Sequence, residues 1–192
     1  MEIDPYLVGV LKGDGWTYDR RKGSYVTAID QAEKNKIIII EEVIPRLRRM
    51  GFSKVKPYRF FAKHDGIFKW RASVYSKALY LELKKIFANI ISYIKRLSME
   101  DAKLFIAGFM DAEGTVGGKK IVIYNQNIEI LRAMWKKLLK MRIEPTNIYR
   151  YNVVYGLTFI RKASIRKLLA EIPARKYKMK SYRAITKWAS GE

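Results

Sequence analysis

The sequence predicts an α+β fold of two pseudo-symmetric halves, each with the element order αββαββα. Three observations predict it: a short motif that occurs twice, the same succession of segments after each copy, and a length of 192 residues, enough for two small domains that share a core. We expect the antiparallel strands of each half to form one sheet and the two motif helices to pack at the interface. The expected halves are residues 1–97 and 98–192.

The repeated motif is the segment "YLVGVLKGDGWTY" at 6–18, which aligns with "FIAGFMDAEGTV" at 105–116. Three residues of the first copy have a counterpart 99 positions later, and the pairs are Gly9 with Gly108, Asp14 with Glu113, and Gly15 with Gly114. One offset shared by three positions indicates tandem copies of about half the chain.

Both motif segments carry the start signals of helices. Asp4 before Pro5 is a good N-cap, and Ser98 with Asp101 three residues later resembles a capping box. Each helix should end at the last glycine of its motif, which suits a left-handed C′ residue. Small residues four apart should let the two helices approach closely; they are Gly9 and Gly13 in one helix, Gly108 and Ala112 in the other.

The segments after each motif alternate in the same order. After the first copy we expect strands at 24–31, 54–63 and 67–75, a helix at 35–50 that Pro45 should kink or break, and a helix from about Lys77. After the second copy we expect strands at 119–126, 146–151 and 153–160, a helix at 127–141, and a helix from about Lys162.

The chain is strongly basic, with 39 Lys plus Arg against 18 Asp plus Glu, a net charge of +21 and a pI near 10.1. Such a charge makes nucleic acid the leading partner and an anionic membrane the second. No apolar run reaches the roughly 18 residues of a membrane span, and the start "MEIDPYLVG" lacks a signal pattern, so we expect a cytoplasmic protein.

Few residue types in this chain could bind a metal. Cysteine is absent and His64 is the only histidine, which excludes a disulfide framework and a Cys/His zinc site. A bound metal would therefore need oxygen ligands, as Mg²⁺, Mn²⁺ and Ca²⁺ do. Asp14 and Glu113 both fall at a helix C-terminus, where a carboxylate is disfavoured by the helix dipole. If the two helices lie side by side, the two carboxylates would repel each other, and a divalent cation bound between them would relieve this repulsion.

The segments "LVGVLKGDG" (7–15) and "IAGFMDAEG" (106–114) resemble the nonapeptide that names the LAGLIDADG homing endonucleases. The resemblance covers nearly the whole chain and is greatest to the monomeric, two-motif members encoded in archaeal introns. The eighth-position acid of the motif is present in both copies. At the sixth position the first copy has Lys12 where the second has Asp111, and the position of Asp111 favours a helix-packing or capping role.

This resemblance implies a site-specific endonuclease that hydrolyses one phosphodiester in each strand of double-stranded DNA. Cleavage would cross the minor groove of a long, asymmetric target and leave 3′ overhangs, with the two sheets forming a saddle on the DNA. The cofactor would be Mg²⁺, with Mn²⁺ able to substitute and Ca²⁺ able to bind. The implied ligands are Asp14 and Glu113, with the backbone carbonyls of Gly13 and Ala112.

Supporting site residues are suggested by position. Gln31 resembles the polar residue of the family near the attacking water, and its partner is Asn125, or Gln126 if the register shifts by one. Lys77 and Lys162 each follow the last strand of a half and are candidates for an active-site base or charge stabiliser, although a solvated lysine remains an equal alternative.

The strands provide the candidate DNA-binding surface. In "FKWRASVY" (68–75) basic and polar residues alternate with apolar ones, which predicts one polar face and one buried face. The candidate DNA contacts are Arg20 and Arg21 in a first loop, Lys54, Lys56, Arg59 and Lys63 on one strand, Lys69, Arg71, Ser73 and Tyr75 on the next, and Lys119, Lys120, Arg150 and Arg161 in the second half. The stretch 175–188 reads as a basic helix that either follows phosphates or covers the second core.

Two other functions remain open from the sequence, and a third does not fit the repeat. An RNA-splicing maturase of the same fold would bind intron RNA with the same basic saddle. A non-catalytic DNA-binding regulator would not need the acid pair. An unrelated basic RNA-binding protein would not explain the motif pairs with a common offset of 99 residues.

Overall fold

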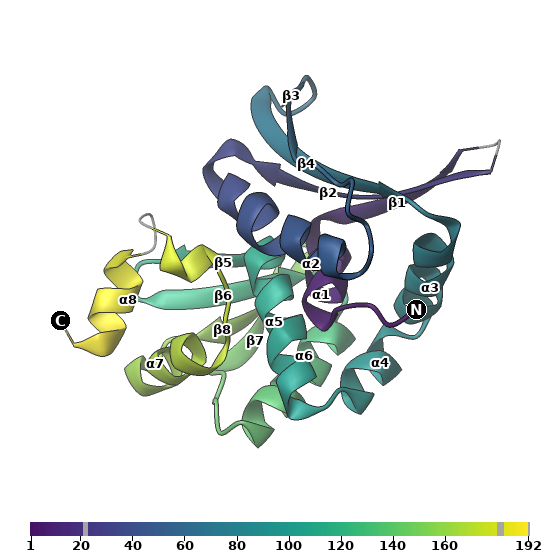
Figure 1. Ribbon diagram of the computed structural model, residues 1–192. Helices are drawn as coiled ribbons and strands as arrows, with labels where there is room; N and C mark the ends of the chain where they lie inside the picture. The colour runs from purple at the N-terminus through teal and green to yellow at the C-terminus, as the bar shows by residue number, and fades with distance from the viewer. Residues whose placement is uncertain (21–22, 180–182, 192) are drawn as a thin grey trace.

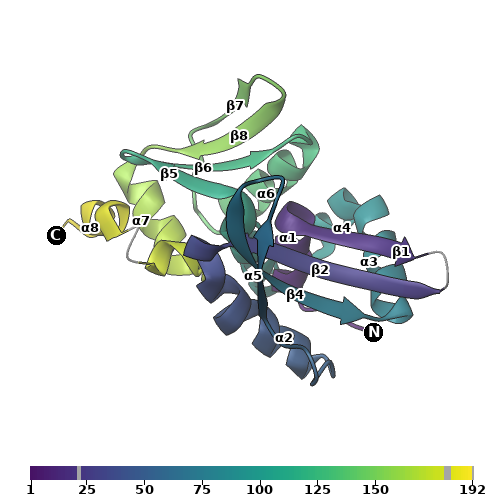
Figure 2. The same cartoon turned by 90° about the horizontal axis from the view of Figure 1, so that it is seen from above.

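The computed structural model describes residues 1–20, 23–179 and 183–191 of the chain. It has an α+β fold with two halves, and each half contains a four-stranded antiparallel sheet with helices packed beside it (Figure 1). The predicted fold class is therefore confirmed. Seen from above, the first helix of each half lies near the centre of the molecule, between the two sheets (Figure 2).

The first half contains helix α1, four strands and the helices that cover them. Its elements are α1 (Pro5–Asp14), β1 (Gly15–Arg20), β2 (Ser24–Ala32), the short 3₁₀-helix η1 (Glu33–Asn35), the π-helix η2 (Ile38–Val43), α2 (Ile44–Arg49), β3 (Tyr58–Ala62), β4 (Ile67–Tyr75), α3 (Lys77–Ala88) and α4 (Ile90–Arg96). The strands are ordered β1-β2-β4-β3 in the sheet.

The second half repeats this plan. Its elements are α5 (Met99–Glu113), β5 (Gly114–Gly117), β6 (Lys120–Asn125), α6 (Ile128–Lys140), β7 (Asn147–Tyr151), β8 (Val154–Phe159), α7 (Lys162–Glu171), the 3₁₀-helix η3 (Lys176–Lys178) and α8 (Arg183–Ser190). The strand order, β5-β6-β8-β7, is the counterpart of the first sheet. We propose a boundary between residues 97 and 98, because Ser98 caps α5 by accepting a hydrogen bond from the Asp101 N–H at 3.1 Å.

The largest contact between elements is the packing of α1 against α5. Gly9 and Gly108, the first small residue of each predicted pair, lie in this contact. A Cβ atom added at Gly9 would fall well under 3.0 Å from the Phe105 carbonyl oxygen, and one added at Gly108 would fall as close to the Tyr6 carbonyl oxygen. The two glycines therefore allow the backbones of the helices to touch, as the repeated spacing predicted.

The ends of the two motif helices differ from expectation. Gly15 has φ −91° and Gly114 has φ −78°, which is extended backbone and not the left-handed C′ conformation. The chain leaves each helix directly into a strand. Glycine is needed there for space, because a Cβ at Gly15 would lie 2.6 Å from Leu11 atoms and one at Gly114 would lie 2.5 Å from the Tyr177 hydroxyl.

Several predicted boundaries were wrong. Pro45 does not break the middle helix of the first half; a π-helical turn precedes it, and the chain continues as α2. Arg20 lies in strand β1 and not in a loop, while Lys54, Lys56 and Lys63 lie outside β3. The stretch 175–188 is not one helix, since η3 and α8 are separate elements.

Apolar side chains from both halves form one core. It includes Leu7 and Val10 of α1, Phe105 and Phe109 of α5, and inward-facing residues of both sheets, among them Ile29 and Ile123. Ile185 of α8 is also buried, so this helix covers the core of the second half. None of the described helices is both long enough and apolar enough to cross a membrane.

Candidate active site

The carboxylates of Asp14 and Glu113 converge where α1 and α5 end together. Glu113 lies directly beside Gly13, because a Cβ built on that glycine would be 2.9 Å from the Glu113 Cγ and 3.5 Å from its Oε1. Burial raises the pKa of Glu113, and the negative charge of Asp14 raises it further. The two acids that the motif pairs in sequence are thus neighbours in space.

Asp14 belongs to a short chain of polar side chains in the first half. The Gln31 amide donates a 2.6 Å hydrogen bond to the Asp14 carboxylate, and the Asn35 amide donates to the Gln31 carbonyl oxygen at 3.3 Å. Gln31 is only 3% exposed. Burial raises the pKa of Asp14, while the Gln31 hydrogen bond and the Lys176 charge lower it. Gln31 therefore fixes the orientation of one acid, and Asn35 fixes Gln31.

The strand register places Asn125 in the position equivalent to Gln31. Gly15 pairs with Ile29 in the first sheet and Gly114 pairs with Ile123 in the second, so Gln31 and Asn125 each lie two residues beyond the equivalent pair. Gln126 follows the end of β6. The Asn125 side chain accepts a 2.9 Å hydrogen bond from the Asn127 N–H, and no described hydrogen bond joins it to Glu113. The two halves of the site thus differ in their supporting groups.

The structure places the two lysines suggested by position away from the acid pair. The Lys77 ammonium lies 5.6 Å from the centre of the Tyr25 ring, and the Lys162 ammonium lies 5.9 Å from the Trp188 ring. Among the described contacts, neither lysine reaches Asp14 or Glu113.

A different lysine, Lys176 of η3, reaches the site. Its side chain is 4% exposed, and its ammonium donates hydrogen bonds to the carbonyl oxygens of Ala112 at 3.1 Å and Gly114 at 3.0 Å. Burial lowers the pKa of Lys176, and the charges of Asp111, Asp14 and Glu113 oppose that shift. Lys176 was not among the predicted site residues, because nothing in the basic stretch "RKYKMK" (175–180) distinguishes a buried lysine from an exposed one.

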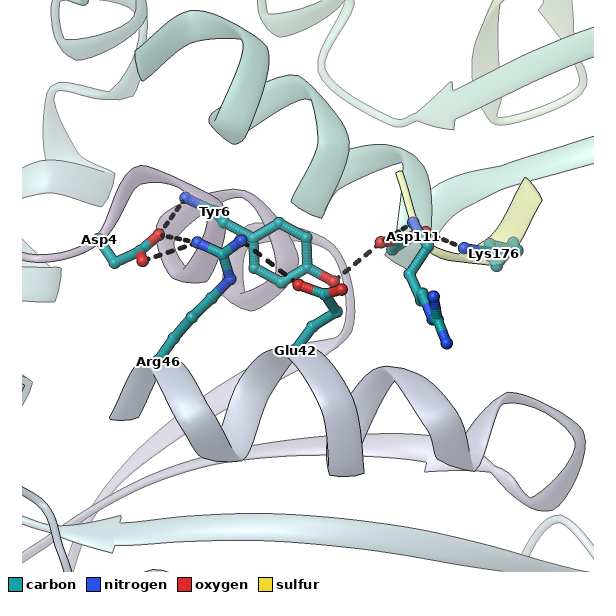
Figure 3. Close-up of polar contacts among 7 residues, drawn as sticks. Asp4, Tyr6, Glu42, Arg46, Asp111 and Lys176 are labelled. Atoms are coloured by element: carbon teal, nitrogen blue, oxygen red, sulfur yellow. Dashed lines mark hydrogen bonds and ion pairs between the residues drawn. The ribbon is translucent and has the colours of Figure 1, made fainter. Parts of the chain in front are cut away.

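Asp111 holds the segment that carries Lys176. Its carboxylate is fully buried and accepts hydrogen bonds from the Tyr6 hydroxyl at 2.8 Å, the Arg175 N–H at 2.8 Å and the Lys176 N–H at 2.6 Å (Figure 3). Burial raises the pKa of Asp111 to about 6, against these hydrogen bonds. Asp111 thus joins α1, α5 and η3, while Lys12 at the same motif position lies over the Phe87 ring.

A second polar group fixes the other end of α1. The Asp4 carboxylate accepts from the Tyr6 N–H at 2.9 Å and from the Arg46 guanidinium at 2.8 Å, and Arg46 also pairs with Glu42 at 3.3 Å (Figure 3). The Arg46 guanidinium lies 4.3 Å from the centre of the Tyr6 ring. The tyrosine that donates to Asp111 is therefore held from both ends.

Replacing Asp111 by Asn should lower the free energy of unfolding by about 1–3 kcal/mol. The amide has one acceptor oxygen where the carboxylate has two, so a buried N–H of Arg175 or Lys176 would face an NH₂ group. Urea denaturation at pH 7 measures the change, with Glu100→Gln as the control because that carboxylate lies on the same helix and is 81% exposed. Equal stability of the two variants would contradict the structural role of Asp111.

The donor set of the site fits a hard divalent ion. Among the described residues, no group of three or more His, Cys, Asp or Glu side chains is arranged to hold a metal. The carboxylates of Asp14 and Glu113 could be completed by the carbonyls of Gly13 and Ala112, by water and by substrate oxygens. Such sets of one or two carboxylates with substrate oxygens are typical of Mg²⁺ sites.

The candidate DNA contacts of the sheets fall into two groups. Some are held in ion pairs: Arg59 with Glu33 at 2.8 Å, Arg71 with Asp30 at 2.5 Å, Arg161 with Glu144 at 3.3 Å, and Lys69 with Asp65. Others are exposed, namely Lys54, Lys56, Lys63, Tyr75, Lys119, Lys120 and Arg150, with Ser73 half-buried. Arg21 and the side chain of Arg20 lie outside the described residues.

Exposed aromatic residues on the first sheet were not predicted as part of this surface. Tyr58, Phe61 and Phe68 are each at least 42% exposed, and the Arg59 guanidinium lies 3.7 Å from the centre of the Phe68 ring. Tyr58 lies opposite Arg71 in the register and shares its face, and the Arg71 guanidinium donates a hydrogen bond to the Tyr58 hydroxyl. Arg59, Phe61 and Phe68 lie on the other face of β3 and β4, so only Tyr58 extends the predicted DNA-binding face.

Comparisons with known proteins agree with this geometry. A model of the LAGLIDADG-like domain matches residues 100–173. An uncharacterized protein of Methanocaldococcus jannaschii is 26% identical over 184 residues; the match covers 87% of this chain but only 65% of that protein. The homing endonuclease I-DmoI of Desulfurococcus mucosus is 28% identical over 149 residues, with 75% of this chain and 73% of I-DmoI covered.

The fold is also shared with a solved structure. The crystal structure of I-DmoI in complex with DNA and Mn superposes with a TM-score of 0.67 at 24% identity, covering 88% of this chain and 94% of that chain. Other structures of I-DmoI contain DNA with Ca or with Mg. With its two motif helices and its two equivalent sheets, the chain is similar to LAGLIDADG proteins over most of its length, and residues 100–173 match the LAGLIDADG-like domain.

Proposed function

We propose that the chain is a site-specific, divalent-metal-dependent DNA endonuclease of the homing type. The observation that carries this proposal is the meeting of Asp14 and Glu113 at the ends of two packed motif helices, in a protein with a net charge of +21. An acid pair is unfavourable beside a polyanion unless cations bind between them. The related I-DmoI is a homing endonuclease whose solved complexes contain DNA.

The chain's own residues would prepare the site for hydrolysis. Asp14 and Glu113, with the carbonyls of Gly13 and Ala112, would hold Mg²⁺ or Mn²⁺, and Ca²⁺ would bind the same oxygens. When bound, the ion polarises the phosphate and lowers the pKa of a coordinated water. Gln31 keeps the Asp14 carboxylate oriented, and Asn125, in the equivalent strand position, would contact the attacking water in the second half. One phosphodiester would be cut in each strand, leaving 3′ overhangs.

The substrate proposed is a long and asymmetric double-stranded DNA site bound by a monomer. Each sheet presents four strands, and strands lie about 4.8 Å apart, so eight strands would span roughly one turn of B-DNA or more. The two sheets differ at equivalent positions of one face, where β4 has Lys69 and Arg71 and β8 has Val154 and Gly156. Different side chains in the two halves favour different half-sites.

Incubation with a plasmid that carries the gene's uninterrupted insertion locus tests the function. With Mg²⁺ on the order of 10 mM, enough to saturate a metal site, the chain should convert supercoiled plasmid to a single linear product. Removal of the ion with EDTA should stop the reaction, because two carboxylates alone can neither polarise the phosphate nor lower the pKa of the attacking water. A plasmid in which the locus is interrupted by the intron is the matched control.

Three outcomes would argue against this function. Intact plasmid together with Mg²⁺-dependent stimulation of intron splicing would assign the basic saddle to RNA, as in a maturase. Tight binding to the locus without any cleavage would assign it to a DNA-binding regulator. Linear product from both plasmids would contradict site specificity.

A further inference from the structure

The two carboxylates of the acid pair have different neighbours. In the first half the nearest polar partner of Asp14 is the neutral amide of Gln31, at 2.6 Å. In the second half the carbonyls on either side of Glu113, those of Ala112 and Gly114, both accept from the Lys176 ammonium. A monovalent cation of the chain itself therefore lies where the Glu113 half of a metal site would form.

Lys176 is fixed in this position by its backbone. The N–H groups of Arg175 and Lys176 are bonded to the two oxygens of Asp111, at 2.8 Å and 2.6 Å. The Arg175 side chain pairs with Glu41 of η2, and Tyr177 is 3% exposed. The ammonium thus belongs to a segment attached to both halves of the protein, and it is unlike the solvated lysines of the surface.

The charges around Lys176 explain why it is buried there. Asp14, Asp111 and Glu113 all interact with the ammonium electrostatically. Three buried or half-buried carboxylates without a cation would repel each other strongly at neutral pH. One ammonium offsets part of this repulsion in the absence of metal.

We propose that the Lys176 ammonium is the resident counter-cation of the acid pair, and that it occupies the Ala112 carbonyl until a divalent ion displaces it. The inference rests on the proposed function, since it concerns the same metal site. A carbonyl oxygen that accepts from an ammonium cannot also bind a divalent ion without bringing two cations together. Divalent-ion binding without DNA should therefore be weaker than an unopposed acid pair would allow.

Titration of the DNA-free protein with Mn²⁺, followed by the electron paramagnetic resonance signal of free Mn²⁺, tests the proposal. Lys176→Met removes the ammonium and keeps an unbranched apolar side chain. We expect it to bind Mn²⁺ at least about 10-fold more tightly than the wild type, the effect of removing one like charge a few ångströms away. Lys178→Met, which removes an exposed charge two residues away, should stay within about 2-fold.

The gain should depend on Glu113. In the Glu113→Gln background, Lys176→Met should change Mn²⁺ affinity by less than about 3-fold, because the carboxylate that benefits from losing the ammonium is absent. An unchanged affinity in the single Lys176→Met variant would overturn the proposal. A weaker affinity would overturn it too, since the ammonium would then position the ligands and not compete with the ion.

A measurement on the wild type keeps the proposal testable if Lys176→Met does not fold. Amine acylation followed by mass spectrometry should modify Lys176 much more slowly than Lys178. Saturating Mn²⁺ should increase the rate at Lys176 at least about 3-fold, because the displaced ammonium loses its two carbonyl partners. A rate at Lys176 that does not change with bound Mn²⁺ would overturn the displacement.

Neither measurement depends on DNA cleavage, so the two proposals can fail separately. Mn²⁺ binding that follows the expected pattern in a chain that never cuts DNA would overturn the nuclease and support the counter-cation. DNA cleavage by a chain whose Mn²⁺ affinity does not change in Lys176→Met would support the nuclease and overturn the counter-cation.

Discussion

Replacing Asp14 by Asn or Glu113 by Gln should lower the rate of DNA cleavage by about 1,000-fold, equivalent to about 4 kcal/mol of transition-state stabilisation. Each substitution keeps the shape of the side chain and removes the charge that would hold a divalent ion. The structure places both carboxylates at one point between the halves, so the loss of either should disable the site. Single-turnover cleavage of a DNA duplex with the target sequence measures the effect.

DNA binding separates a loss of chemistry from a loss of the substrate. Both variants should bind the target at least as tightly as the wild type, because removing a carboxylate lowers repulsion of the phosphates. Asp19→Asn and Glu129→Gln, which neutralise exposed acids in the same two halves, should leave the rate within about 3-fold. Full cleavage by either active-site variant would contradict the assignment of the acid pair.

The duplicated motif predicted the part of the structure that repeats. Gly9 and Gly108 mark the helix contact, and the alternating segments predicted strands that end close to those observed, such as 67–75 for β4. The repeat predicted Asn125 as the counterpart of Gln31 but left Gln126 as the alternative, because a shift of one residue in a strand turns the side chain to the other face. The registers of the two sheets place Asn125 in the equivalent position.

The parts of the site that do not repeat could not be predicted in this way. Lys176 lies in the stretch 175–188, which was predicted as one basic helix, and its burial depends on hydrogen bonds that Asp111 accepts from Tyr6, Arg175 and Lys176, residues far from it in sequence. Lys77 and Lys162 show the converse limit of the repeat. Both follow a strand at matching positions, but the helices they begin turn their ammonium groups toward Tyr25 and Trp188. The position of a lysine along the chain does not determine the direction in which its side chain points.

Local rules also failed where tertiary contacts changed the backbone. Gly15 and Gly114 have the residue type of left-handed helix ends, but each directly starts a strand, so the glycine serves close packing and not positive φ. Pro45 lacks an N–H and should end a helix, but a π-helical turn before it accommodates the missing hydrogen bond. Apolar packing of Ile38, Ile39 and Val43 stabilises this segment.

Gly9→Ala and Gly108→Ala should each lower the free energy of unfolding by about 3 kcal/mol. Helix propensity alone predicts the opposite sign, since alanine in a helix is favoured over glycine by about 1 kcal/mol. In the structure the new Cβ would fall well under 3.0 Å from a carbonyl oxygen of the facing helix, and a backbone atom cannot rotate away as a side chain can. Urea denaturation therefore decides between local preference and helix packing by the sign of the change.

Gly117→Ala is the matched control for this experiment. Its added Cβ would meet only the Lys120 Cε, at 3.4 Å, and that flexible side chain can move, so we expect a change of less than about 0.5 kcal/mol. The interface variants should also cleave DNA more slowly under conditions in which they remain folded, because separating α1 from α5 moves Asp14 away from Glu113. Stabilisation by either interface substitution would show that the helices can separate at no cost, and close packing of the motif glycines would then not determine the geometry of the acid pair.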